Sequence, residues 1–140
     1  MELDIRYDTS GIDWNGISET LKLVGMAYYE PEKHRKAFEN SRVTVFVYHD
    51  GRLIGFGRAI SDDAYQAAVY DVAVLPEFQG KGVGKKILET ILSRLPGCNV
   101  ILYASPGKED FYKAFGLRKM KTGMALFRNG PLMKEKGFTE

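Results

Sequence analysis

The chain has 140 residues, of which 44% are hydrophobic and 27% are charged, so it is long and apolar enough to bury a core and disorder is not favoured. Its 20 basic and 18 acidic residues leave a net charge of +2, which does not favour nucleic-acid binding. A lone cysteine and two histidines exclude a disulfide framework and give no plausible zinc site, so we expect no metal. The N-terminus lacks an apolar signal core and no apolar run approaches ~18 residues, so we expect a cytoplasmic protein without a membrane segment.

The first half of the chain predicts a short strand, two helices and a hairpin. Residues 3–7 alternate as a strand does, and apolar residues at helical spacing run from Ile12 to Tyr29. After Pro31, a second helix is expected over about 32–39. Two apolar runs then flank Asp50-Gly51, which is a strong signal for a tight hairpin turn.

The middle of the chain predicts a buried strand followed by an amphipathic helix. Residues 66–75 are almost all apolar, as expected of a strand that is covered on both faces. The helix that follows carries one apolar stripe and ends at Pro96-Gly97. Residues 99–104 are then interpreted as another buried strand.

The last part of the chain predicts a short helix and two short strands. Ser105 is interpreted as the N-cap of a helix that runs through Phe115 and that Gly116 closes. Residues 117–120 and 123–127 are expected to be strands, whereas the tail after them gives little signal. With no linker or repeat in the sequence, residues 1–140 are expected to form a single α/β domain around a mixed sheet.

The most informative segment joins the strand 66–75 to the helix after it. Three alternating glycines between Gly80 and Gly84 let a ligand approach the backbone closely, because no Cβ lies in the way. The helix that begins there directs unpaired N–H groups and the positive end of its dipole to the same place. Nearby lysines add positive charge, so the segment predicts a site for a phosphate or pyrophosphate. The residues expected to form this site are Gln79, Gly80, Lys81, Gly82, Val83, Gly84 and Lys85.

The glycine spacing disfavours three other interpretations of this loop. A Walker A loop has four residues between its glycines and a hydroxyl residue after its Lys, but three residues separate Gly80 from Gly84, and Lys86 stands at the hydroxyl position. A dinucleotide fingerprint needs a further glycine where the chain has Ile87. A turn that only packs a helix on a sheet does not require three glycines alternating with lysines.

Two motifs resemble those of one known family. Gln79-Gly-Lys-Gly-Val-Gly84 matches the signature Gln/Arg-x-x-Gly-x-Gly/Ala of the GNAT superfamily of N-acetyltransferases, and residues 71–79 resemble the fourth strand and turn of that family. Phe111-Tyr112-Lys-Ala-Phe-Gly-Leu117 resembles its later Phe-Tyr-x-x-x-Gly-Phe element. The resemblance covers nearly the whole chain. It implies a single-domain GNAT-like fold, with a central mixed β-sheet flanked by helices and a pyrophosphate-binding loop between strand 4 and helix 3.

The resemblance also implies acetyl-coenzyme A as the cofactor and assigns roles to several residues. The backbone of Val72, Ala73 and Val74 is expected to bind the pantetheine arm and to supply an amide for the oxyanion of the reaction. Tyr112 is expected to be the general acid that protonates the departing thiolate. Many members have an Asn four positions before this Tyr, but this chain has Lys108, which is expected to reach a cofactor phosphate or to be solvated.

Asp71 is the expected general base. An alkylammonium with a pKa near ~10.4 must lose a proton before it can attack a thioester. Asp71 is the one carboxylate in the apolar run 67–75, where burial would raise its pKa towards a useful range. The alternatives are an interior aspartate that holds loop amides or a lysine, and Glu30 or Glu77 as the base.

The acceptor is expected to be a small primary amine, with a peptide amine as the second choice. In this superfamily the first two helices and two turns build the acceptor pocket, and here they supply aromatic rings and carboxylates that suit a cation. These residues are Tyr28, Tyr29, Glu30, His34, Phe38, Asp62, Asp63 and Tyr65. Two further hypotheses remain, a non-catalytic module that senses an acyl-coenzyme A and a nucleotide-binding regulator. A homodimer, frequent in the family, and a monomer both fit the composition.

Overall fold

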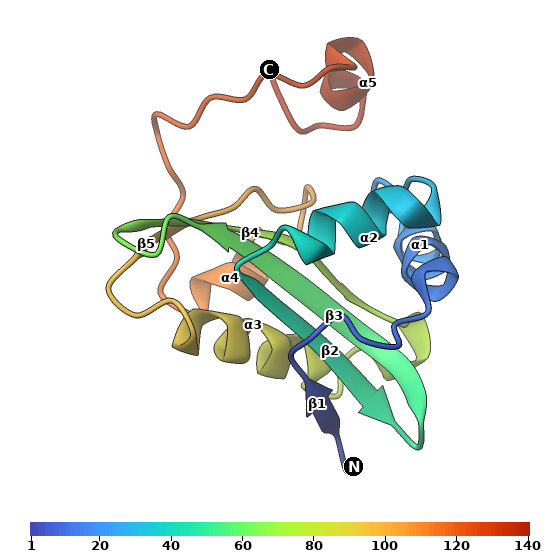
Figure 1. Cartoon of the computed structure of the whole chain (residues 1–140). Coiled ribbons are helices and arrows are strands. Elements are labelled where there is room, and N and C mark those ends of the chain that lie inside the picture. The colour runs from blue at the N-terminus through green and yellow to red at the C-terminus, as the bar shows by residue number, and fades with distance from the viewer. The chain divides into compact units, whose positions relative to one another are not determined.

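Five strands form one mixed β-sheet in the computed structural model, which describes all 140 residues (Figure 1). The strands are β1 (Asp4–Arg6), β2 (Val43–His49), β3 (Arg52–Ser61), β4 (Gln66–Val74) and β5 (Asn99–Ile101), and they lie in this order across the sheet. Neighbours from β1 to β4 pair antiparallel, whereas β5 pairs parallel to β4. This confirms the predicted mixed sheet flanked by helices.

The chain divides into two compact units, Met1–Leu102 and Tyr103–Glu140. The first contains the sheet, the helices α1 (Trp14–Leu23), α2 (Pro31–Glu39) and α3 (Val83–Ser93), and the 3-10 turn η1 (Pro76–Phe78). The second contains the short helices α4 (Glu109–Lys113) and α5 (Gly130–Glu135).

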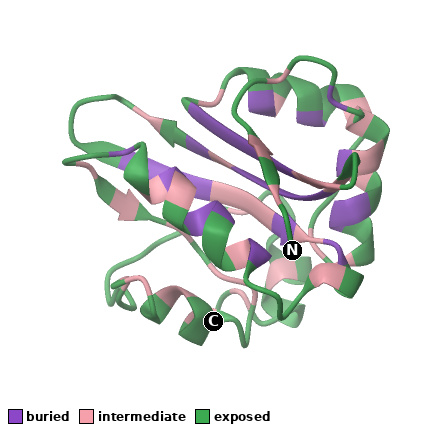
Figure 2. Cartoon of the chain, turned by 90° about the horizontal axis from the view of Figure 1, so that it is seen from below, coloured by how far each residue is buried: buried purple, intermediate pink, exposed green.

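Helices cover both faces of the sheet in the first unit (Figure 1). On one face, α1 and α2 bury Ile17, Leu21 and Phe38 against Phe46 and Phe56 of the central strands. On the other face, α3 approaches a part of β3 that has glycines instead of side chains. Figure 2 shows the buried residues gathered along the central strands. The predicted apolar stripe of α3 is confirmed, because its buried residues are Val83, Ile87, Leu88 and Ile91.

The predicted hairpin between β2 and β3 is confirmed. His49 pairs with Arg52 across a two-residue turn, in which Asp50 has φ 49° and Gly51 has φ 76°. Positive φ at both central residues is typical of the type I′ turn, whose twist matches that of the flanking strands.

The first helix ends earlier than the sequence predicts. It stops at Leu23 rather than near Tyr29, because Gly25 takes a left-handed conformation with φ 78°. The N–H of Met26 then bonds the carbonyl of Leu21 at 2.9 Å, and that of Gly25 bonds the carbonyl of Lys22 at 3.1 Å. This pair of bonds is a Schellman motif, which closes the helix.

Two boundaries around the start of the second unit also differ from the prediction. The strand expected over 99–104 ends at Ile101, and this side chain is 51% exposed rather than buried. The next helix begins at Glu109 with Lys108 as its N-cap, so Ser105 is not the cap. Ser105 instead accepts the N–H of Lys108 at 2.9 Å in a separate turn.

The two strands expected over 117–120 and 123–127 are wrong. The structure has no strand in this stretch, and Met124 and Leu126 are 95% and 80% exposed. A strand is stable only with a hydrogen-bonded neighbour, and the second unit contains none. The tail instead forms α5, where the Asn129 side chain accepts the N–H of Leu132 at 3.2 Å as an N-cap.

Candidate functional site

The glycine loop between β4 and α3 has the backbone that close approach of a ligand requires. Gly80 and Gly82 have φ of 75° and 84°, a region that residues with a Cβ rarely adopt. A Cβ added at either position would meet no atom within 4 Å, so the space beside the backbone is open. Gly82 is the N-cap of α3, and Gly84 lies in its first turn.

The start of α3 presents amide groups that the helix does not use. The first helical bond runs from the N–H of Lys86 to the carbonyl of Gly82 at 3.0 Å. The N–H groups of Val83, Gly84 and Lys85 therefore have no acceptor within the helix, and they lie at its positive end. The Lys81 ammonium lies 5.5 Å from the centre of the Phe78 ring, while the Lys85 ammonium lies 3.9 Å from the Glu89 carboxylate. This arrangement fits a phosphate or pyrophosphate.

The register of β4 separates the backbone groups of Val72 and Val74 from those of Ala73. Leu75 donates to the carbonyl of Ile54 at 2.8 Å, and Ala73 pairs with Phe56 of β3. Because backbone groups alternate in direction along a strand, those of Val72 and Val74 face the opposite edge. At that edge β5 pairs with β4 only as far as Ala68. Of the three predicted residues, Val72 and Val74 thus have the geometry to bind a ligand.

Gln79 lies across this open edge. Its side-chain amide Nε2 donates to the carbonyl of Val74 at 3.0 Å. The contact connects two of the residues predicted to bind the cofactor, and it uses a backbone acceptor of β4.

Asp71 is paired with an arginine. Its carboxylate accepts the Nε–H of Arg58 at 2.7 Å, and the two side chains are only 21% and 17% exposed. Arg58 also donates Nη1–H to the hydroxyl of Ser41 at 3.3 Å. The structure therefore places Asp71 in an interior ion pair, close to the alternative in which an interior aspartate holds a cation. Sequence reasoning missed Arg58, although a single cation in the apolar strand 53–60 was a usable signal.

The residues expected to bind the acceptor differ in burial and in their contacts. Tyr28, Tyr29 and Tyr65 are about half exposed or more, but Phe38 is fully buried among core aromatic rings, so its expected contact with an acceptor is wrong. Buried His34 accepts the N–H of Tyr29 at its Nε2 at 2.8 Å. Desolvation lowers the pKa of His34, opposed by the negative charge of Asp71 and aided by Arg58 and Lys33.

The two carboxylates of the β3–β4 turn already have partners. Asp62 accepts the N–H groups of Ala64, Tyr65 and Gln66 at 2.8, 2.9 and 3.0 Å, and these bonds lower its pKa. Asp63 pairs with Arg42 at 2.6 Å. Both carboxylates hold the turn in shape.

The second unit carries the remaining predicted residues. Tyr112 lies in α4, next to the Phe111 ring at 5.0 Å between centroids, and burial raises the pKa of its phenol. The phenol therefore keeps its proton at neutral pH and can act as an acid. Lys108 is the exposed N-cap of the same helix.

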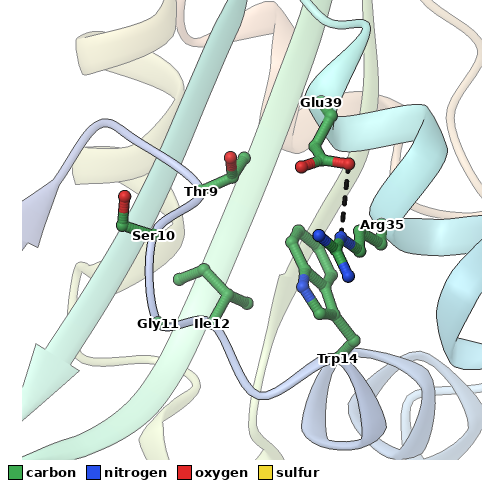
Figure 3. A pocket seen from close by; sticks show the side chains of 7 residues that line it. All are labelled: Thr9, Ser10, Gly11, Ile12, Trp14, Arg35 and Glu39. Carbon is green, nitrogen blue, oxygen red and sulfur yellow. Dashed lines mark hydrogen bonds and ion pairs between the residues drawn. The ribbon is translucent and has the colours of Figure 1, made fainter.

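A hollow of about 430 Å³ lies elsewhere in the first unit (Figure 3). It is lined by the turn 9–12, by Trp14, and by Arg35 and Glu39, whose side chains pair at 3.3 Å. None of the predicted site residues lines it. The structure contains no cluster of three or more side chains that could hold a metal, and none of its helices has the length and apolar character to cross a bilayer.

Comparisons with known proteins agree with this architecture. The model of the acetyltransferase (GNAT) family matches residues 13–117, so the chain belongs to the GNAT acetyltransferase family. Members of this family take the acetyl group from acetyl-coenzyme A, and the protein is accordingly an acyl-coenzyme A-dependent acetyltransferase, as the sequence predicts.

The sequences of individual relatives match either most of this chain or about half of it. The rice protein (Oryza sativa) named serotonin N-acetyltransferase 2, chloroplastic, is 32% identical over 136 residues, covering 89% of this chain and 68% of its own length. The soybean protein (Glycine max) named histone acetyltransferase TAP1 is 40% identical over 77 residues, covering 52% of this chain and 33% of its own. A solved GNAT-family structure from Xanthomonas campestris is similar with a TM-score of 0.82 and 25% identity, covering 93% of this chain and 96% of that one.

Proposed function

We propose that the protein transfers the acetyl group of acetyl-coenzyme A to a small primary amine, by direct attack of the amine within a ternary complex. The observation that carries the proposal is the glycine loop, where left-handed Gly80 and Gly82 open the backbone at the amino end of α3. The name of the rice relative supports the acceptor class, since serotonin is a small primary amine.

The residues of the first unit fit the donor. The loop 79–85 offers amide groups and lysines for the two bridging phosphates. The open edge of β4 offers the backbone groups of Val72 and Val74 to the pantetheine arm, once Gln79 releases the carbonyl of Val74. When bound, the donor supplies a thioester that an amine can attack. An amide of β4 that stabilises the resulting oxyanion is typically worth about 2.7–4 kcal/mol.

Protons must also move during the reaction. Tyr112, protonated because burial raises its pKa, is the proposed source of the proton for the departing thiolate. The acceptor must lose one proton, and Asp71 was the expected base. Its carboxylate is already bound to the Arg58 guanidinium at 2.7 Å in an interior ion pair, so it is not free to approach an acceptor amine, which disfavours this role for Asp71.

Thermal unfolding with and without acetyl-coenzyme A tests the donor assignment. At a hundred times its dissociation constant, a ligand adds about 2.7 kcal/mol of stability and shifts the midpoint by several degrees. ATP with magnesium is the control and should give no shift. Absence of a shift at millimolar acetyl-coenzyme A would contradict the assignment of the loop.

Release of free thiol with a panel of amines tests the acceptor. We expect turnover with small primary amines and not with a lysine-containing peptide. The reverse result would favour a protein acceptor, which the name of the soybean relative suggests. Binding of acetyl-coenzyme A without turnover on any amine would favour the non-catalytic sensor.

A further inference from the structure

Strand β4 contains an irregularity at the centre of the proposed donor site. Arg58 of β3 pairs with Tyr70, but Phe56 pairs with Ala73, so Asp71 and Val72 together lie opposite Gly57. Two residues opposite one is a β-bulge. Asp71 has φ 56°, a left-handed conformation that residues with a side chain rarely adopt.

The bulge decides which backbone groups face the open edge of β4. Side chains and backbone groups alternate along a strand, so one extra residue inverts the pattern beyond it. With the bulge, Ala73 bonds towards β3, while Val72 and Val74 face the open edge. Without it, Val74 would face β3, and Ala73 would face the donor. The conformation of Asp71 therefore sets the register of the donor site.

Arg58 is the side chain that holds Asp71 in place. Its Nε–H donates to the Asp71 carboxylate at 2.7 Å, and this is the ion pair of the chain in which both side chains are most buried. Arg58 itself is fixed on two sides. Its guanidinium lies 5.7 Å from the centre of the Phe38 ring and 5.3 Å from that of Tyr70.

A short network continues from Arg58 to α2. Its Nη1–H donates to the Ser41 hydroxyl at 3.3 Å, and that hydroxyl donates to the carbonyl of Ala37 at 2.7 Å. The bulge is thus connected to the end of a helix that packs on the core. Because these contacts fix the Arg58 guanidinium, a movement of the Asp71 carboxylate would break the ion pair.

We propose that Arg58 is a positioning residue which, through Asp71, holds the bulge of β4 and so places the backbone groups of Val72 and Val74 against the donor. The inference rests on the proposed function and deepens it. Asp71 is then a positioning residue as well, and the acceptor proton leaves by another group or by water.

Three variants and a matched control test this inference by kinetics. Arg58→Gln, Asp71→Asn and the double variant remove the ion pair. Arg42→Gln removes the exposed ion pair with Asp63 and should behave as the wild type. A shift of about 1 Å in the groups that position a substrate can cost on the order of a hundredfold in rate. We therefore expect both single variants to lose at least about tenfold in kcat. The double variant should lose no more than the worse single variant, because the two side chains act as one unit.

The pH profile separates positioning from base catalysis. If Asp71 only holds the bulge of β4, the Asp71→Asn variant keeps the acidic limb of the pH profile, which is the fall of kcat/KM towards low pH. Arg58→Gln and Asp71→Asn should then be impaired to a similar extent. Loss of that limb in Asp71→Asn, or wild-type kinetics in Arg58→Gln, would overturn the inference. If Arg58→Gln does not fold because a lone carboxylate is left buried, the double variant supplies the comparison without that charge.

Amide NMR of the ligand-free protein distinguishes failure of this inference from failure of the proposed function. We expect the Val72 and Val74 amide signals to shift, and their hydrogen exchange to accelerate, in Arg58→Gln and not in Arg42→Gln. Unmoved amides would overturn the inference whatever the activity. If the Val72 and Val74 amide signals shift but the protein neither binds nor uses acetyl-coenzyme A, the role of Arg58 in holding the bulge is supported and the proposed function is contradicted.

Discussion

Tyr112 is the residue on which the proposed proton transfer most directly depends. Burial raises the pKa of its phenol, so the group is protonated across the neutral range. Tyr112→Phe keeps the ring and removes the proton. We expect kcat to fall by roughly 10²–10⁴-fold, the usual contribution of a general acid, with the Kd for acetyl-coenzyme A unchanged.

Thiol release and calorimetry measure these two quantities. Tyr7→Phe is a suitable control, because Tyr7 lies in the first unit with its ring under the Arg94 guanidinium at 3.7 Å. A wild-type kcat in Tyr112→Phe would remove Tyr112 from the role of acid.

Asp71 shows what residue-level reasoning from sequence can and cannot reach. As the lone carboxylate of an apolar strand it was recognised as unusual, but its partner Arg58 is 13 residues away on the neighbouring strand. The pair depends on the exact register, which a bulge alters, and a bulge leaves little trace in the pattern of side chains. The sequence thus found the position and could not assign its contact.

At the scale of elements, the loop before α3 depends on the conformation of Gly82. Its φ of 84° disfavours any side chain, although a Cβ there would meet no atom within 4 Å. We expect Gly82→Ala to cost about 1–2 kcal/mol in unfolding free energy, from backbone strain alone. Relief of this strain by rotation of the loop would misdirect its amides, so acetyl-coenzyme A binding should weaken by roughly tenfold.

Gly97→Ala is a matched control for that prediction. Gly97 has φ 76° and equally open space, but it lies in the turn after α3. Denaturant unfolding should show a similar loss of stability in both variants, and calorimetry a weaker Kd only in Gly82→Ala. Equal affinity in the two variants would contradict a role of the loop backbone in binding.

The close packing of α3 on the sheet depends on Gly57. A Cβ at this position would lie 2.9 Å from Ile87, 3.0 Å from Ile91 and 3.2 Å from Val72. Gly57→Ala should therefore lower the unfolding free energy by roughly 1–3 kcal/mol, as overpacking of a filled core does. Chemical denaturation measures this loss, and Gly130→Ala, whose Cβ would meet nothing within 4 Å, should lack it.

Local chemistry explains which elements were predictable. Asp50-Gly51 determines a turn and Pro31 favours a helix start through the conformation of a few neighbouring residues, and the structure has both features. The end of α1 was missed because the apolar spacing continues past Gly25, whose left-handed conformation stops the helix. The strands expected over 117–127 failed because a strand needs a distant partner, which no local pattern reveals.

At the scale of the whole molecule, His34 makes stability depend on pH. Burial lowers its pKa in the folded state, so the unfolded chain binds a proton more readily. Its contribution to stability is complete above the ordinary pKa of about 6.5 and is lost as the pH falls through the lowered value. We expect the unfolding free energy to decrease below about pH 6.5, by at most about 1.4 kcal/mol per pH unit.

Urea unfolding between pH 8 and pH 5.5 tests whether the unfolding free energy falls as the pH is lowered. In His34→Gln the slope over this window should flatten, even if loss of the bond from the Tyr29 N–H lowers stability throughout. An unchanged slope in His34→Gln would assign the pH dependence to other groups.

The incomplete pairing of β4 has a consequence for the protein in solution. The pairing of β5 with β4 ends at Ala68, so the rest of β4 has no second strand beside it in the sheet. Such an edge is a template on which a strand of another molecule can pair, which is how many proteins begin to aggregate. The Gln79 side chain donates to one carbonyl of this stretch, that of Val74. If the donor lies along this edge as proposed, it would also hinder such pairing, and we expect depletion of the donor to favour self-association.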